Sequence, residues 1–305
     1  MIRRSDPALD ALVSQDAVVE KLAAGFVFTE GPIWLPEGHL LFSDIPENTI
    51  YNWTPSSATL EEFRKPSGFD GTGAPKGAFI GSNGLTLDAT GRLTICEHGN
   101  RRVTRLEHDG SLTVLASHYD GKRLNSPNDV VYKSDGAMYF TDPPYGLVAQ
   151  DKDAAKELDF NGVYRWKDGV LTLLHREMTR PNGLAFTPDE QFLYVGNSDP
   201  ERKIWMRFPI LADGTFGQGS LFADVTERKE PGLPDGMKID INGNLYCTGP
   251  GGIHVFTAAG KHLGLIALPE IPANLHWGDA DARTLYITAR TGLYRIRMTA
   301  TGIRP

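Results

Sequence analysis

Six short polar residues recur along the chain, most of them beside Gly, Pro or Asp, and the same apolar pattern follows each. These residues, which we call the openers, are Glu30, Asn83, Asn128, Asn182, Asp235 and Asn274. Subtracting successive numbers gives separations of 53, 45, 54, 53 and 39 residues. If the six units surround one axis, their carboxylate and amide oxygens meet there. Such oxygens are ligands for a hard divalent cation, so the openers predict a metal site.

The two carboxylate openers, Glu30 and Asp235, supply the negative charge that a divalent ion needs. The predicted metal ligands are Glu30, Asn128, Asn182 and Asp235. Asn83 and Asn274 are left open between contacting substrate and holding their own loops. Because no Cys or clustered His accompanies the openers, Ca²⁺ is favoured, with Mg²⁺, Mn²⁺ or Zn²⁺ as alternatives.

Each opener begins a run of about six alternating residues that ends in a turn and is followed by a second strand. The turns are PEGH at 36–39, ATGR at 89–92, SDGA at 134–137, PDEQ at 188–191, INGN at 241–244 and DADAR at 279–283. Asn-Gly and Asp-Gly dipeptides are typical of turns, so the openers could serve only to form turns. Each unit already has a separate hairpin turn after its opener, however, so the opener is not needed for that purpose. A third apolar run follows in every unit, and a fourth in most. Six such units predict an all-β, six-bladed propeller with four-stranded antiparallel blades.

The last unit lacks a convincing fourth strand, because RMTATGIRP follows its third strand at 292–296. The segment VVEKLAAG at 18–25 precedes the first opener and resembles the fourth strands of other units. We therefore expect the N-terminal strand to complete the last blade, which removes an unpaired edge and makes 1–305 a single propeller domain. Within the N-terminal extension 1–16, residues 5–16 are predicted to form a short helix.

A second set of polar residues stands where the second strands return to the opener face. They are Asp44, Glu97, Asp142 and Asn197, with His98 beside Glu97 and Tyr145 after Asp142. The predicted substrate contacts are Asn83, Asn128, Glu97, His98, Asp142 and His276; for the two histidines a structural role is the alternative. The insertions 64–81, 117–126 and 143–162 open on the same face and are predicted to carry recognition.

Composition limits the partners of this chain. A formal net charge of −7 disfavours nucleic acid and anionic membranes as partners, because both need basic surface on the protein, and it favours a small molecule.

The first ten residues lack the apolar core of a secretory signal, so we expect a cytoplasmic protein, with a processed periplasmic form as the alternative. Cys96 and Cys247 fall in opposite blades and are expected to be buried thiols. The oligomeric state is left open.

Four segments carry a resemblance to a known family: TEGPIWLPEGHLLFSD, SPNDVVYKSDGAMYFTDPPYG, RPNGLAFTPDEQFLYVGNSD and LPDGMKIDINGNLYCTGPGGIHVF. Over residues 25–298 the chain resembles the gluconolactonase, regucalcin and luciferin-regenerating enzyme family, and ICEHGNRRVTRLEHDG resembles its bacterial gluconolactonase branch most. The resemblance implies a six-bladed propeller with a divalent ion, commonly calcium, in its central funnel. It implies Glu30, Asn128 and Asn182 as ligands and Asp235 as the catalytic residue. Ser126 stands where the regucalcin branch has Arg.

The leading hypothesis is a metal-dependent hydrolase that opens a sugar lactone, such as glucono-1,5-lactone, by metal-activated water. Asp235 would take the proton of the water and return one to the leaving alkoxide. Two alternatives stay open. The same ion could catalyse phosphotriester or fluorophosphate hydrolysis. Alternatively, the propeller could be a non-catalytic ligand-binding module, whose ion only stiffens the centre of the ring where the openers meet, which we call the hub.

Overall fold

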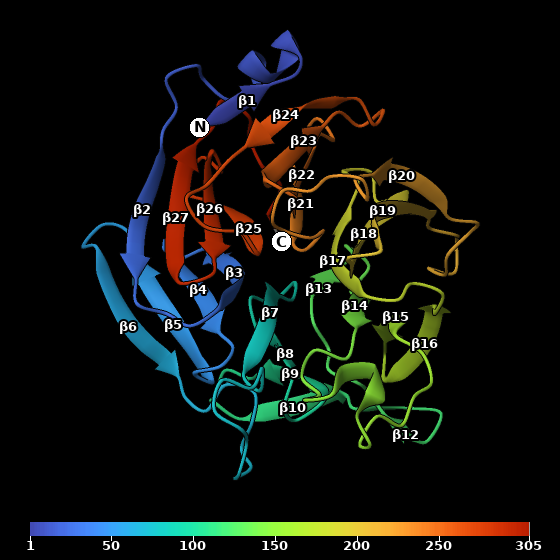
Figure 1. Cartoon of the computed structure of the whole chain (residues 1–305). Helices are drawn as coiled ribbons and strands as arrows, with labels where there is room; N and C mark the ends of the chain where they lie inside the picture. The colour runs from blue at the N-terminus through green and yellow to red at the C-terminus, as the bar shows by residue number, and fades with distance from the viewer. Residues whose placement is uncertain (305) are drawn as a thin grey trace.

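The computed structural model describes residues 1–304 as a ring of antiparallel β-sheets around a central channel (Figure 1). Six sheets of the predicted kind are present, so the six-bladed propeller is confirmed. Blades 1 to 3 contain β3 (Thr29–Leu35), β4 (His39–Asp44), β5 (Thr49–Thr54) and β6 (Thr59–Arg64); β7 (Ser82–Leu87), β8 (Leu93–Glu97), β9 (Arg102–Leu106) and β10 (Leu112–Ala116); and β13 (Val130–Tyr132), β14 (Met138–Asp142), β15 (Gly162–Lys167) and β16 (Val170–His175).

Blades 4 to 6 continue around the ring. They contain β17 (Pro181–Phe186), β18 (Phe192–Asp199), β19 (Arg202–Pro209) and β20 (Ser220–Asp224); β21 (Met237–Ile239), β22 (Leu245–Gly249), β23 (Gly252–Phe256) and β24 (His262–Ile266); and β25 (Asn274–Gly278), β26 (Thr284–Ala289), β27 (Gly292–Arg297) and β2 (Val19–Ala24). The remaining elements are β1 (Ile2–Arg4), the hairpin β11 (His118–Tyr119) and β12 (Lys122–Arg123), and the 3₁₀ helices η1 (Pro7–Ala11) and η2 (Gln150–Lys152).

The ring is closed by the N-terminal strand, as the sequence predicts. β2 pairs antiparallel with β27 from Val19 opposite Ile296 to Ala24 opposite Gly292. The sequence did not show that β1 adds a fifth strand to blade 5 beside β24. Nor is 5–16 one helix: only the 3₁₀ turn η1 forms, with Asp6 accepting the N–H of Ala8 at its start. Within residues 1–304, no helix has the length and apolarity to span a membrane.

The apolar core lies between the blades, with one cluster of buried side chains at each of the six blade-to-blade interfaces. At the closure, Phe26, Trp34 and Phe42 pack with Tyr286 and Leu293 of blade 6. A blade therefore buries its apolar faces only against its neighbours, as expected of a repeat architecture. Each of the two cysteines is a buried, unpaired thiol in a different interface.

The first strand is irregular at the opener in three blades. The pairing register shifts between Glu30 and Ile33 in blade 1, and equivalent shifts follow Ser82 in blade 2 and Pro181 in blade 4. A bulge of this kind changes the direction of a side chain relative to the regular ladder. In blade 6, by contrast, Asn274 pairs regularly with Thr288. Asn274 is therefore held differently from the openers of blades 1, 2 and 4.

The glycine after an opener serves blade packing and not a turn. A Cβ at Gly31, Gly84, Gly183 or Gly236 would meet the opener of the next blade or its neighbour at under 3.0 Å. At Gly183 the obstacle is the backbone oxygen of Asp235, only 2.2 Å away. Because backbone cannot move aside cheaply, these glycines let adjacent blades approach closely at the hub.

We therefore expect Gly183→Ala to lower the free energy of unfolding by about 2 kcal/mol or more, because the added methyl overlaps the hub backbone. Gly196→Ala in the same blade is the matched control, since its Cβ would stand 3.4 Å or more from any atom. Urea unfolding of the two variants measures the difference. Equal stabilities would show that the approach of the blades is not as tight as described.

Candidate active site

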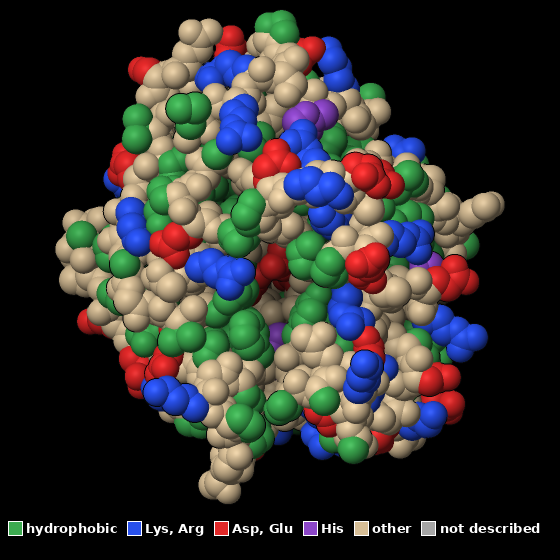
Figure 2. All heavy atoms as spheres, viewed as in Figure 1, with side chains coloured by type: hydrophobic (Ala, Val, Ile, Leu, Met, Phe, Trp, Pro, Cys, Tyr) green, Lys and Arg blue, Asp and Glu red, His purple; other side chains and the backbone are tan. Residues whose placement is uncertain are grey.

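The openers meet at one end of the central channel, where they are almost completely removed from solvent except for Asp235, which is partly buried. Figure 2 shows a hollow in the middle of the ring with acidic side-chain atoms inside it. Asp235 lies close enough to Glu30 and to the amide of Asn182 for both of them to shift its pKa. Side chains that are up to 205 residues apart in the sequence (235 − 30) therefore lie together at the centre of the ring.

Glu30 is fixed by two donors. Its Oε2 accepts the N–H of Gly31 at 2.6 Å and the Nδ2 of Asn274 at 3.0 Å. Burial and the nearby charge of Asp129 nevertheless raise the pKa of Glu30 to about 7. A carboxylate in this position is strongly stabilised by any cation that takes the place of the proton.

Asp235 lies against Glu30 across the channel. Desolvation in the funnel, together with the charges of Glu30 and Asp129, raises the pKa of Asp235 well above its usual range, while the amide of Asn182 opposes this shift. Two carboxyl groups in contact cannot both ionise cheaply without a counter-ion. The pair is thus suited either to a shared proton or to a divalent ion.

Asn83 and His98 form a buried pair in blade 2. Asn83 Nδ2 lies 3.1 Å from His98 Nε2, and burial lowers the pKa of His98 to about 4, so that the ring is neutral. The Oδ1 of Asn83 is buried without a hydrogen-bond partner in the part of the chain that the structure describes. A buried carbonyl oxygen without a donor is costly, and it marks a position for an ion or a substrate hydroxyl. His98 is therefore neutral near pH 7 and is placed to orient the side chain of Asn83.

Asn274 acts as a donor at the hub. Its Nδ2 also lies 3.4 Å from Asp129 Oδ2, and its Oδ1 accepts the N–H of Leu275 at 2.8 Å. Both ends of the amide are therefore used within the protein. Of the two roles left open by the sequence, this geometry favours holding the hub together.

Asp129 is a third buried carboxylate that sequence reasoning missed. It occupies the position after the opener where blades 1, 2, 4 and 5 have glycine, and its Oδ1 accepts the N–H of Val130 at 2.9 Å. The segment SPND contains the signal, an acidic residue directly after an opener. The amine of Lys238, deeper in the channel, interacts favourably with both Asp129 and Glu30. The hub therefore contains three carboxyl groups, with the amine of one lysine deeper in the channel.

The second ring of polar residues anchors the segments that lead into the openers. Asp44 accepts the N–H groups of Val27 (2.9 Å) and Phe28 (3.0 Å), which lie three and two residues before Glu30. Asp142 does the same with the N–H groups of Asn125 and Ser126, both at 2.7 Å, before Asn128. Asn197 accepts the N–H of Arg180 at 2.8 Å, before Asn182. Each carboxylate oxygen of Asp142 thus helps to position this segment, and its contact with substrate stays a prediction.

Glu97, another predicted substrate contact, is hydrogen-bonded within its own blade. Its carboxylate is almost fully buried and accepts from Asn100 (2.6 Å), Arg102 (2.7 Å) and Thr104 (2.5 Å). Register explains this, because Glu97 pairs directly with Arg102 in the β8–β9 ladder. The side chain therefore belongs to the internal hydrogen bonding of blade 2.

His276 lies in the channel but beyond the hub. It follows Asn274 by two positions on β25, so it points to the same side of the strand and lies deeper along it. Its Nδ1 is 2.8 Å from the carbonyl oxygen of Trp277, and burial lowers its pKa to about 3. The structural role, kept as the alternative above, is the one this geometry favours.

The long insertions are tied together by a buried arginine that sequence reasoning also missed. Arg101 Nε donates to the carbonyl of Leu124 at 2.7 Å, and its Nη1 donates to the carbonyl of Ala155 at 2.7 Å. It thereby joins the insertion 117–126 to the insertion 143–162. The latter carries Tyr145, whose hydroxyl group lies near Asn182 and Asp235. This loop pair is in place to contact a molecule at the hub.

The hub fits a divalent cation on the chemistry of its donors. Glu30 and Asp235 offer carboxylate oxygens in contact, and the Oδ1 of Asn83 has no partner. Oxygen-only sets of carboxylates and amides are typical of Ca²⁺ sites. No cluster of three or more His, Cys, Asp or Glu suited to a metal occurs in residues 1–304, so amide oxygens are needed to complete any coordination here.

Fold and site together define a six-bladed propeller with a buried, oxygen-rich acidic hub. Residues 28–291 match the family model described as SMP-30/Gluconolactonase/LRE-like region, and the chain belongs to this family. It is 40% identical to the gluconolactonase of Zymomonas mobilis over 97% of this chain and 85% of that protein. It superimposes on a gluconolactonase structure from Xanthomonas campestris with a TM-score of 0.85 and 34% identity, covering 97% and 94% of the chains. A regucalcin from Agrobacterium tumefaciens, at 19% identity and a TM-score of 0.75 over 95% and 97% of the chains, shares the fold.

Proposed function

We propose that the protein is a lactonase that opens a sugar lactone, such as glucono-1,5-lactone, to the corresponding aldonic acid. The observation that carries the proposal is the contact of two carboxyl groups, Glu30 and Asp235, beside the amide of Asn182 at the centre of the ring. Membership of the family and the 40% identity to a gluconolactonase support the substrate class.

The residues proposed to hold a divalent ion are Glu30, Asn128, Asn182 and Asp235. When bound, such an ion supplies Lewis-acid polarisation of the lactone carbonyl and stabilises the charge that develops on its oxygen. The oxygen-only donor set favours Ca²⁺. The related fold from Agrobacterium tumefaciens, described as a calcium-binding protein, supports the same choice.

Asp235 is proposed as the general base. It accepts a proton from the attacking water and later delivers one to the ring oxygen that leaves as an alcohol. The environment of the funnel keeps its affinity for protons high, which suits a group that must both take and return a proton near neutral pH. Asn83, held by His98, is proposed to direct its unpartnered Oδ1 to a substrate hydroxyl.

The experiment that tests the proposal compares metal-stripped protein, verified by elemental analysis, with the same protein after addition of Ca²⁺, Mg²⁺, Mn²⁺ or Zn²⁺. Glucono-1,5-lactone opening, corrected for its spontaneous hydrolysis, should fall by about 100-fold or more on stripping and return with Ca²⁺. A phosphotriester is measured in parallel. Full lactone turnover without metal contradicts the role of the ion, and turnover of the phosphotriester alone contradicts the substrate class.

A further inference from the structure

Three carboxyl groups crowd the hub without a contact ion pair. Glu30 and Asp129 are 2% and 4% exposed, and the amide nitrogen of Asn274 lies 3.0 Å from an oxygen of the first and 3.4 Å from an oxygen of the second. Asp235 lies against Glu30. The ion pairs within residues 1–304 include none of these three carboxylates. A charge that balances them must act across a longer distance or come from outside the chain.

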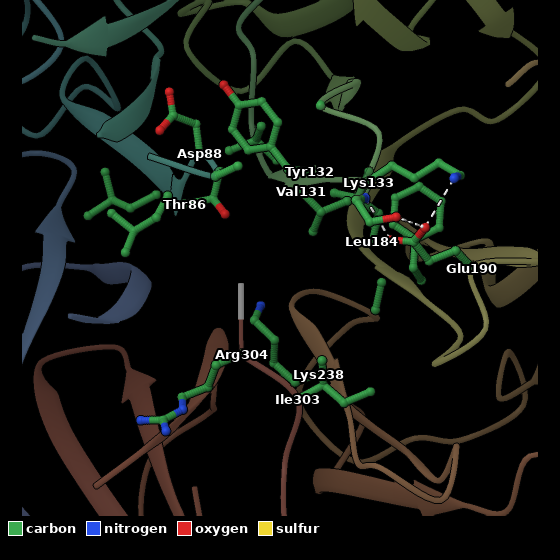
Figure 3. A pocket seen from close by; sticks show the side chains of 18 of the residues that line it. Thr86, Asp88, Val131, Tyr132, Lys133, Leu184, Glu190, Lys238, Ile303 and Arg304 are labelled. Carbon is green, nitrogen blue, oxygen red and sulfur yellow. Dashed lines mark hydrogen bonds and ion pairs between the residues drawn. The ribbon is translucent and has the colours of Figure 1, made fainter. Parts of the chain in front are cut away.

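The amine of Lys238 is a cation that faces this group. Lys238 lies on β21, three residues after Asp235, and Figure 3 shows its amine directed toward the open centre of the channel. Its one hydrogen bond within residues 1–304 is to the carbonyl oxygen of Met237 at 3.1 Å. Burial raises the pKa of Asp129 and of Glu30, and the charge of Lys238 opposes both shifts. Lys238 therefore favours the ionised form of both carboxylates.

The other basic side chains around this part of the channel are engaged elsewhere. Arg92, Arg105 and Lys133 form ion pairs with carboxylates of the neighbouring turns, at 2.8, 2.8 and 3.0 Å. Arg304 donates to the backbone carbonyl of Asp279 at 2.9 Å. Lys238 is thus the basic residue of this cavity whose charge is directed at the hub.

The charges of the hub can be counted. The nearby histidines add none near pH 7, because burial lowers the pKa of His98 to about 4 and that of His276 to about 3. When ionised, the three carboxylates carry three negative charges and the amine of Lys238 carries one positive charge. Two negative charges remain, which a divalent cation neutralises. A trivalent cation would leave one positive charge, and a buried charge without compensation is costly.

We propose that Lys238 is the charge-selecting residue of the hub: its amine is a tethered counter-ion that sets the preference of the site for a divalent over a trivalent cation. The inference rests on the hub ion of the proposed function and adds the residue that selects the charge of that ion. Oxygen ligands alone do not make this selection, because trivalent lanthanides such as Tb³⁺ take the same carboxylate and amide oxygens as Ca²⁺. Coulomb energy, by contrast, is proportional to the charge of the ion.

The test is calorimetric titration of metal-free, full-length protein with Ca²⁺ and, separately, with Tb³⁺. Because Lys238→Met removes one positive charge, it should tighten Ca²⁺ binding by about tenfold or more. Tb³⁺ should gain about 1.5 times as many decades, since the repulsion that is removed is proportional to the ionic charge. A gain of about tenfold for Ca²⁺ thus corresponds to about 30-fold for Tb³⁺. Lys238→Gln, which is neutral but polar, should give the same pattern.

Lys133→Met is the matched control. It removes the same charge from a lysine that lines the same cavity but is paired with Glu190. Both affinities should stay within about twofold of those of the unmodified protein, because Glu190 already balances that charge. Glu30→Gln should weaken the binding of both ions, as expected if they share the hub.

Equal gains for the two ions in Lys238→Met and Lys238→Gln would overturn the proposal, because the lysine would then act through its size and not its charge. No gain for either ion, or the same pattern in Lys133→Met, would also contradict it. Tb³⁺ binding that Glu30→Gln leaves unchanged would mean that the trivalent ion does not enter the hub, against the proposal. These outcomes leave Ca²⁺ binding and lactone turnover of the unmodified protein untouched. An unmodified protein that binds no Ca²⁺ would instead contradict the hub ion, and this inference with it.

Discussion

Asp235→Asn is expected to lower kcat for lactone opening by about 10²- to 10⁴-fold, the usual contribution of a positioned general base. The amide keeps an oxygen that can coordinate an ion, but it cannot accept a proton. Metal binding should therefore persist with weaker affinity, and excess Ca²⁺ should not restore turnover. Steady-state kinetics at saturating ion, with affinity measured by calorimetry, separates the two effects.

The matched control for that variant is Asp129→Asn. It makes the same change on another buried carboxylate of the hub, one whose oxygens already accept from Val130 and Asn274. We expect it to weaken metal affinity through the loss of charge and to regain most of its turnover in excess Ca²⁺. If Asp129→Asn lost turnover as completely as Asp235→Asn, the base would not be assigned to Asp235 alone.

The architecture was accessible from the sequence because it depends on periodicity. Polar openers, hairpin turns and alternating strands recur at every unit, and the missing fourth strand of blade 6 matched the surplus segment 18–25. These features are local, so each can be recognised without knowing its neighbours. The pairing of β1 with β24 of blade 5 has no such signal, because a strand of three residues is too short to show a periodic pattern.

The direction of individual side chains was not accessible in the same way. Asp142 and Glu97 occupy equivalent positions at the ends of second strands, yet Asp142 anchors the segment before Asn128 and Glu97 pairs with Arg102 across the ladder. What separates them is the residue that the neighbouring strand or loop places opposite each one. Lys238 is a similar case, because only the closed ring reveals that its amine is enclosed with Asp129 and Glu30.

The largest expected effect on stability is the response of the melting temperature to Ca²⁺. Binding to the native state alone stabilises by about 2.7 kcal/mol at a concentration 100 times Kd. For a chain of 305 residues, this corresponds to about 4 °C. Glu30→Gln should flatten this response, because it removes one of the charges that hold the ion while its oxygen still accepts from Gly31 and Asn274.

Asn274→Ala provides the comparison within the hub. Asn274 donates to Glu30 and uses its own oxygen on Leu275, so it orients a ligand without being one. Its loss should reduce the Ca²⁺ response less than Glu30→Gln does. An equal or larger reduction in Asn274→Ala would mean that the ligand set is drawn wrongly, and no Ca²⁺ response in the unmodified protein would count against an ion at the hub.

The pH dependence of the same melt tests the physical cause. In metal-free protein the pKa of Glu30 is raised from 4.5 to about 7, so the folded state holds a proton that the unfolded chain has already released. The contribution of Glu30 to stability is therefore fully present below about pH 4.5 and is lost as the pH rises through about 7. Because the ion must displace that proton, the Ca²⁺ response should be small at pH 5, grow through pH 7 and then level off. Glu30→Gln has no proton to displace at this position, so the pH dependence of its remaining response should be clearly weaker. A Ca²⁺ response independent of pH between 5 and 8 in the unmodified protein would place the ion away from Glu30.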